Sequence, residues 1–163
     1  MLSKLVADAL NDQIRHEVHS SYLYLAMAAS CEAANLPGFA HWLKVQSREE
    51  YDHAMKIYEY LNDQGARVVL QAIDAPPAEY KVPHEIFKQV LEHEKKITAL
   101  IHRLYGTAVK ENDYATQNML QWFVKEQVEE EKNATAIVEQ LKMVGDAPAG
   151  LIMLDRYLAQ RGK

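Results

Sequence analysis

The chain has 163 residues, a hydrophobic fraction of 48%, a charged fraction of 25% and a formal net charge of −5. These values fit one domain with a substantial core, and we expect residues 1–163 to form it. The acidic balance argues against nucleic-acid binding, which needs a basic patch, and no apolar run is long enough to span a membrane. The single cysteine, Cys31, excludes a disulfide within this chain, so we expect a cytoplasmic location.

The first predicted helix covers residues 3–34. Its apolar side chains recur at steps of three and four, the spacing of a helix face that packs into a bundle, and Ser3 suits the N-cap position. We call such a face the inner row of its helix. Glu17 occupies a position in this inner row. The short turn at residues 35–38 predicts that the next helix runs antiparallel to the first.

The second predicted helix ends near Gly65, a glycine suited to the position after a helix end. Its inner row contains Gln46, Glu50 and His53 among apolar residues. Glu50 and His53 form a Glu-x-x-His pair, and residues three apart lie on one helix face. A carboxylate and an imidazole are therefore predicted to point together into the core, where an isolated charge is very unfavourable.

Residues 66–83 have no helical periodicity. A helix of about 28 residues is ~42 Å long at 1.5 Å per residue, whereas about eighteen extended residues reach roughly 60 Å at ~3.3 Å each. We therefore expect this segment to cross the full length of the bundle. The third helix would then run parallel to the second.

The third and fourth helices are predicted at residues 84–110 and 114–144. Glu94 is the one charged residue in the inner row of the third helix, while Gln127 and Glu130 are the polar members in the fourth. Together the four long helices predict an all-α bundle over residues 3–144.

A short fifth helix is predicted at residues 151–160, after a linker at residues 145–150. Residues 151–154 are all apolar and cover every side of its first turn, which indicates burial. We expect the linker to let this helix turn away from its own bundle and pack against other subunits.

Each inner row is thus interrupted by polar residues near the middle of its helix. Four buried glutamates would carry a formal charge of −4, and no Lys or Arg lies in the four rows to balance it. Two divalent metal ions would balance that charge. Carboxylate and imidazole ligands without a thiolate suit iron or manganese, with zinc as a further candidate.

This arrangement is known from ferritin-like di-iron proteins, in which two helices each give a Glu and two each give a Glu-x-x-His. Here Gln127-x-x-Glu130 stands in place of the second Glu-x-x-His. Over its whole length the chain resembles a bacterial or archaeal non-haem ferritin. The stretches that carry the resemblance are residues 15–17, 22–25, 49–53, 93–94 and 122–131.

The resemblance implies two adjacent iron sites. The implied ligands of the first iron are Glu17, Glu50 and His53. The implied ligands of the second are Glu50, Glu94 and Glu130, so that Glu50 would bridge the two ions.

The resemblance also implies roles around this centre. Gln127 corresponds to a glutamine beside it, Tyr24 to a tyrosine that hydrogen-bonds a ligand and supplies an electron, and Trp122 to another electron donor. A third, weaker iron site towards the shell interior would combine Glu130 with three further carboxylates, Glu49, Glu126 and Glu129. The simpler interpretation of these three is that they are solvated surface acids, and that Tyr24 and Trp122 only pack.

The function implied by the resemblance is iron storage and detoxification. Fe(II) would be oxidised by O2 or H2O2 at the di-iron centre, and ferric mineral would be stored inside a shell of twenty-four subunits, with the last helix along its four-fold axes. One alternative is a haem-containing bacterioferritin, but that family has a second Glu-x-x-His and a methionine where this chain has Glu130 and Asp52, so no haem is expected. Another alternative is a non-catalytic helical scaffold protein, which would have no need for buried carboxylates.

Overall fold

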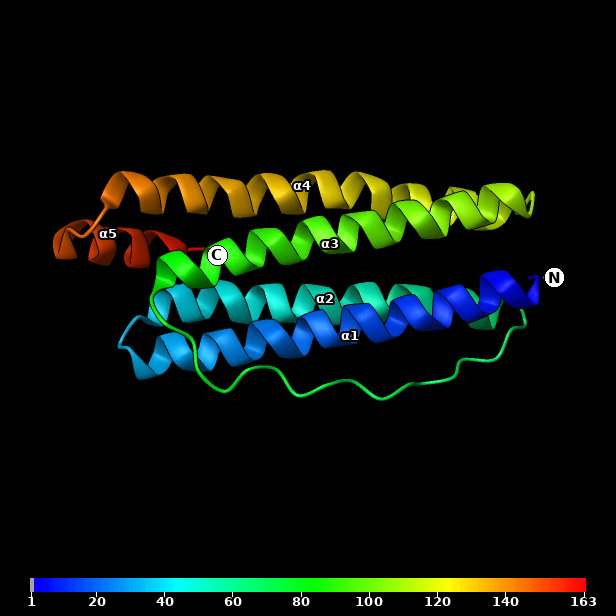
Figure 1. Ribbon diagram of the computed structural model, residues 1–163, viewed down its shortest axis with the longest axis horizontal. Coiled ribbons are helices and arrows are strands. Elements are labelled where there is room, and N and C mark those ends of the chain that lie inside the picture. The colour runs from blue at the N-terminus through cyan, green and yellow to red at the C-terminus, as the bar shows by residue number, and fades with distance from the viewer. Residues whose placement is uncertain (1) are drawn as a thin grey trace.

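The computed structural model describes residues 2–163 and is all-α (Figure 1). Four long helices and one short helix follow one another along the chain: α1 (Lys4–Ala33), α2 (Pro37–Asp63), α3 (Pro83–Lys110), α4 (Tyr114–Val144) and α5 (Pro148–Leu158). No strand occurs among the described residues. The predicted four-helix bundle with a short fifth helix is confirmed. None of the helices in residues 2–163 combines the length and apolar character that a membrane span requires.

The helix ends follow from local sequence. The hydroxyl of Ser3 accepts a hydrogen bond from an amide of the first turn of α1 at 3.3 Å, and the Asp113 carboxylate does the same for α4 at 3.0 Å. Pro37 and Pro83 open α2 and α3, where the missing N–H of proline costs nothing. Gly65 follows the end of α2 with φ 68°, a conformation that glycine adopts without steric cost.

The segment between α2 and α3 runs along the whole bundle, beside α1 and α2 (Figure 1). The consequence is the predicted topology, in which α1 and α2 are antiparallel and α3 is parallel to α2. Asn11 of α1 anchors the start of this segment: its amide donates to the Arg67 carbonyl at 3.1 Å and accepts from the Val69 amide at 2.7 Å.

The bundle core consists of two apolar clusters that lie at opposite ends of the helices. One cluster includes Tyr24, Phe39 and Phe87, and the other includes Leu10 and Ile101. Along each of the four long helices, the buried glutamates and His53 occur between the residues of one cluster and those of the other. The polar layer is therefore held between two packed apolar layers, in the middle of the bundle.

The fifth helix differs from the expectation in its bounds and in its packing on its own bundle, whereas its contact with other subunits stays a prediction. The helix begins at Pro148, earlier than residue 151, because proline suits the first helical position, and it ends at Leu158. It also packs on its own subunit, since the buried Asp155 carboxylate accepts hydrogen bonds from the amides of Gly38 and Phe39 at 2.8 and 2.9 Å. These are free N–H groups in the first turn of α2, and a carboxylate is a favourable partner for them.

Gly38 is required for this contact. A Cβ atom added to Gly38 would lie 1.6 Å from the carbonyl oxygen of Asp155. On the outer side of α5, Ile152, Met153 and Tyr157 remain at least half exposed. The short helix thus has one face against α2 and one apolar face directed outwards.

Candidate metal centre

Five side chains that could bind metal converge in the polar layer from all four long helices. Glu17 comes from α1, Glu50 and His53 from α2, Glu94 from α3 and Glu130 from α4, and each is no more than 5% exposed. They form two groups of three in which the potential ligand atoms all lie within 4.8 Å of one another. One group is Glu17, Glu50 and His53, and the other is Glu50, Glu94 and Glu130. Glu50 belongs to both groups.

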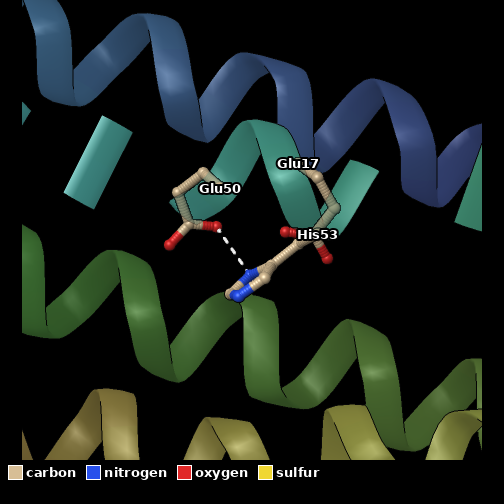
Figure 2. Close-up of side chains that lie close together, drawn as sticks. All are labelled: Glu17, Glu50 and His53. Atoms are coloured by element: carbon tan, nitrogen blue, oxygen red, sulfur yellow. Dashed lines mark ion pairs between the residues drawn. The ribbon is translucent and has the colours of Figure 1, made fainter. Parts of the chain in front are cut away.

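The first group comes from α1 and α2, and its three side chains point toward one another on the side of these helices that faces α3 (Figure 2). The Nδ1 atom of His53 lies 3.5 Å from Oε2 of Glu50. Gln13 donates a hydrogen bond to Oε1 of Glu17 at 2.8 Å, but the buried Oε2 of Glu17 has no hydrogen-bond partner. A buried oxygen without a partner is costly, and a cation bound between these three side chains would satisfy it.

Burial raises the pKa of every carboxyl group in the centre. It raises the pKa of Glu17 to about 8, with the nearby Glu50 carboxylate adding to the effect, and it raises the pKa of Glu50 well above its ordinary value. The pKa of Glu130 is raised to about 7 by burial and by the charge of Glu94. These groups resist ionising side by side in an apolar surrounding. Divalent cations would relieve both causes and displace the protons.

Glu94 is held by two neighbours. The Tyr24 hydroxyl donates to Oε1 of Glu94, while the Gln127 amide donates to Oε2 and to the backbone carbonyl of Glu94, each at 3.2 Å. These donors oppose the effect of burial, so the pKa of Glu94 is raised only to about 6. Burial also raises the pKa of Tyr24 well above its ordinary value, which keeps the phenol protonated as a donor. The hydrogen bond implied for Tyr24 by the resemblance is present.

Gln46 is a residue of the centre to which the sequence analysis gave no role. Its amide nitrogen donates to Oε1 of Glu50 at 2.9 Å and to Oε2 of Glu130 at 2.8 Å. It therefore connects carboxylates of α2 and α4. The signal in the sequence was present, because Gln46 is a polar residue in an apolar inner row, one helical turn before Glu50.

The residues of the predicted third site are only partly brought together. Glu126 joins His53 and Glu130 in a group whose ligand atoms lie within 4.8 Å of one another. Glu49 instead forms an ion pair of 2.6 Å with Arg161, and Glu129 is exposed. Among residues 2–163, neither Glu49 nor Glu129 belongs to any group of side chains whose ligand atoms lie close enough together to hold a metal ion.

Trp122 lies beside the first group rather than within it. Its ring packs edge-on against His53, with ring centroids 5.3 Å apart, and the Lys56 ammonium lies 4.5 Å from its centroid. Trp122 as a whole is 38% exposed. Trp122 thus connects a candidate ligand to the surface, and its role as an electron donor stays a prediction.

Comparison with known families matches residues 7–144 to the ferritin-like domain. The chain belongs to the ferritin family. This ferritin is 43% identical over 158 residues to a probable bacterial non-heme ferritin-like protein of Haemophilus influenzae, covering 97% of this chain and 96% of the relative. It is 42% identical over 161 residues to the bacterial non-heme ferritin of Bacteroides fragilis, covering 99% and 100%.

The solved structures give the same result. The open pore ferritin from the hyperthermophilic archaeon Archaeoglobus fulgidus superposes with a TM-score of 0.98 at 44% identity, covering 99% of each chain. The family resemblance found in the sequence and the bundle with its long crossover are therefore both confirmed.

Proposed function

We propose that this ferritin is an iron-storage protein and a ferroxidase that oxidises two Fe(II) ions per subunit. The observation that carries the proposal is that Glu50 belongs to both groups of potential ligands. Two metal ions with a common carboxylate are close enough to give electrons to one oxidant molecule. The family membership and the non-heme names of the relatives support iron as the substrate, and they give no support to the haem-containing alternative.

The proposed binding sites follow the two groups. Glu17 and His53 would bind the first Fe(II), Glu94 and Glu130 the second, and Glu50 would bridge them. Binding displaces the carboxyl protons, since the ligands must be ionised. The resulting cluster of carboxylates favours Fe(III) over Fe(II) because it interacts more strongly with the higher charge.

The proposed reaction balances with either oxidant. Each Fe(II) loses one electron, and the two electrons with two protons convert O2 to H2O2, or H2O2 to two molecules of water. The side chains supply geometry and electrostatics, while the metal ions carry the electrons. Tyr24 and Gln127 would keep Glu94 oriented during this change. We also propose that Tyr24 and Trp122 can each donate a further electron to the oxidant.

We also propose the domain organisation, the assembly and the third iron site that the family resemblance implies. It is one domain, since α5 packs on α2, and twenty-four copies would form a cytoplasmic shell that holds ferric mineral. The outward apolar residues of α5 support a subunit contact there. A third iron site at Glu49, Glu126 and Glu129 would require Glu49 to leave Arg161.

The test is anaerobic preparation of the metal-free protein, followed by aerobic addition of Fe(II) with stopped-flow absorbance. A fast ferric signal that saturates at two Fe(II) per subunit is expected, together with a large assembly in size-exclusion chromatography with light scattering. A protein that neither binds nor rapidly oxidises Fe(II) would instead be a helical scaffold.

A further inference from the structure

Arg161 lies beyond the end of α5, yet it reaches the neighbourhood of the metal centre. Its Nη1 donates to the Trp42 carbonyl at 3.2 Å, and its guanidinium lies 4.2 Å from the centroid of the Trp42 ring. Its backbone carbonyl is 2.8 Å from Nε2 of His41, and Asp155 ties α5 to the start of α2. The last residues of the chain are therefore fixed on α2 in a defined position.

The Nη2 atom of Arg161 contacts two side chains of α2. It donates to Oε1 of Gln46 at 2.8 Å and to Oε2 of Glu49 at 2.6 Å. The Arg161 side chain is only 18% exposed and Gln46 is 1% exposed. The contact with Gln46 is thus largely shielded from water, where a charge-assisted hydrogen bond is strongest.

This contact decides which way the Gln46 amide points. A guanidinium has donors and no acceptor, so the amide oxygen must face Arg161. The amide nitrogen then faces the centre, where it donates to Glu50 and Glu130. If the amide rotated by half a turn, its nitrogen would face the guanidinium cation, and its oxygen would face Glu50 and Glu130; once those two groups are ionised, both contacts would be repulsive.

We propose that Arg161 is a positioning residue for the second metal site and acts through Gln46. The inference rests on the proposed function, and it adds a residue from the end of the chain to the centre. By fixing the Gln46 amide, Arg161 keeps one oxygen of Glu50 and one of Glu130 engaged, and it thereby sets the direction of their remaining oxygens. Glu17 and His53 have no contact with Gln46 or Arg161 among the described interactions, so the second site depends on Arg161 more than the first.

The experiment compares metal binding by four assembled variants with that of the wild type. The variants are Arg161→Gln, Arg156→Gln, Gln46→Leu and the double variant with Arg161→Gln and Gln46→Leu. Arg156 is the matched control, since it is an exposed arginine in the same tail. Each protein is titrated anaerobically with Co(II) by visible absorbance, and its assembly is checked by light scattering.

The expected result is two Co(II) per subunit in the wild type and in Arg156→Gln. Arg161→Gln should keep its first site and bind the second Co(II) about tenfold more weakly, the usual scale for loss of an outer partner of metal ligands. The double variant should bind no more weakly than Gln46→Leu, because Arg161 acts through the residue already removed. Wild-type binding by Arg161→Gln would overturn the inference, as would independent losses that multiply in the double variant.

Arg161→Lys separates positioning from folding, because lysine keeps the cation but lacks the planar fork. An assembled Arg161→Lys protein with a weakened second site supports the inference. If Arg161→Gln does not assemble and Arg161→Lys binds both Co(II) like the wild type, Arg161 acts on the fold through its charge and the inference is wrong. A wild type that takes up no second Co(II) refutes the proposed function as well, whereas two Co(II) in both wild type and Arg161→Gln refutes this inference alone.

Discussion

The carboxylate cluster should make the metal-free protein less stable as the pH rises. Burial raises the pKa of Glu17 to about 8, of Glu130 to about 7 and of Glu94 to about 6 in the folded chain, above the ordinary 4.5. Between pH 4.5 and the raised pKa of each group, the folded chain retains a proton that the unfolded chain has released. The free energy of unfolding therefore falls as the pH rises. For these three groups the loss should begin near the ordinary pKa and continue up to about pH 8.

The magnitude follows from Glu17, whose pKa is raised the most of the three. At 1.36 kcal/mol per pKa unit, a shift from 4.5 to about 8 corresponds to on the order of 5 kcal/mol. Metal binding should offset this loss. A ligand at 100 times its dissociation constant stabilises the folded state by about 2.7 kcal/mol, so two metal ions contribute roughly 5 kcal/mol.

The assay is thermal unfolding at fixed protein concentration, at about pH 5 and about pH 8, with EDTA or with Co(II). In EDTA the melting temperature should be lower at the higher pH. Co(II) should raise it strongly there and little at the lower pH, where protons occupy the ligands. Glu17→Gln is the matched control, because it removes one titrating group and should melt higher than the wild type in EDTA at the higher pH. A melting temperature in EDTA that is constant or rises with pH would refute the reasoning.

Three further outcomes are expected. Glu50→Ala should abolish the fast phase of Fe(II) oxidation in stopped-flow absorbance, because both metals lose a ligand; a wild-type rate for the first two ions would exclude bridging. His53→Ala and Glu130→Ala should lose different sites in anaerobic Co(II) titration, whereas equal loss of both would indicate one cooperative centre. Gly38→Ala should destabilise by about 3 kcal/mol or more through overlap with Asp155; an unchanged melting temperature would contradict that close contact.

The fold and the core of the centre were predictable because both depend on periodicity. Glu17, Glu50, Glu94 and Glu130 each break an apolar row, and a buried charge in such a position demands a partner. Since the bundle aligns the middles of its helices, residues that break each row near its middle must meet. The structure brings these four glutamates and His53 together in the two predicted groups, while their binding of iron stays a proposal.

For the predicted third iron site, the helical periodicity of the sequence does not indicate where the side chains lie. Glu49 and Glu129 lie outside the inner rows, so no buried charge forces them toward a common point. Arg161 contacts Glu49 from a distance of 112 residues along the chain, and nothing in the local pattern of either residue predicts that pairing. Glu126 reaches the centre because His53 and Glu130, already placed by the inner rows, lie beside it.

The short fifth helix was misplaced for a related reason. Of its apolar residues 151–154, the structure buries only Leu154 fully, while Ile152 and Met153 stay at least half exposed; the sequence does not say which surface covers the helix. That surface is chosen by Gly38, which has no side chain to keep the backbone of Asp155 away, and by two free amides that the Asp155 carboxylate satisfies. A helix end and a glycine on α2 thus determine where α5 docks.

This docking has a consequence for the centre. The polar layer lies between the two apolar clusters, and each carboxyl group in it needs a partner that fixes its orientation. Asp155 holds α5 to the start of α2, and Arg161 continues from α5 to Gln46, one turn from Glu50. The tail therefore braces α2, the helix that supplies Glu50, which is common to both candidate groups.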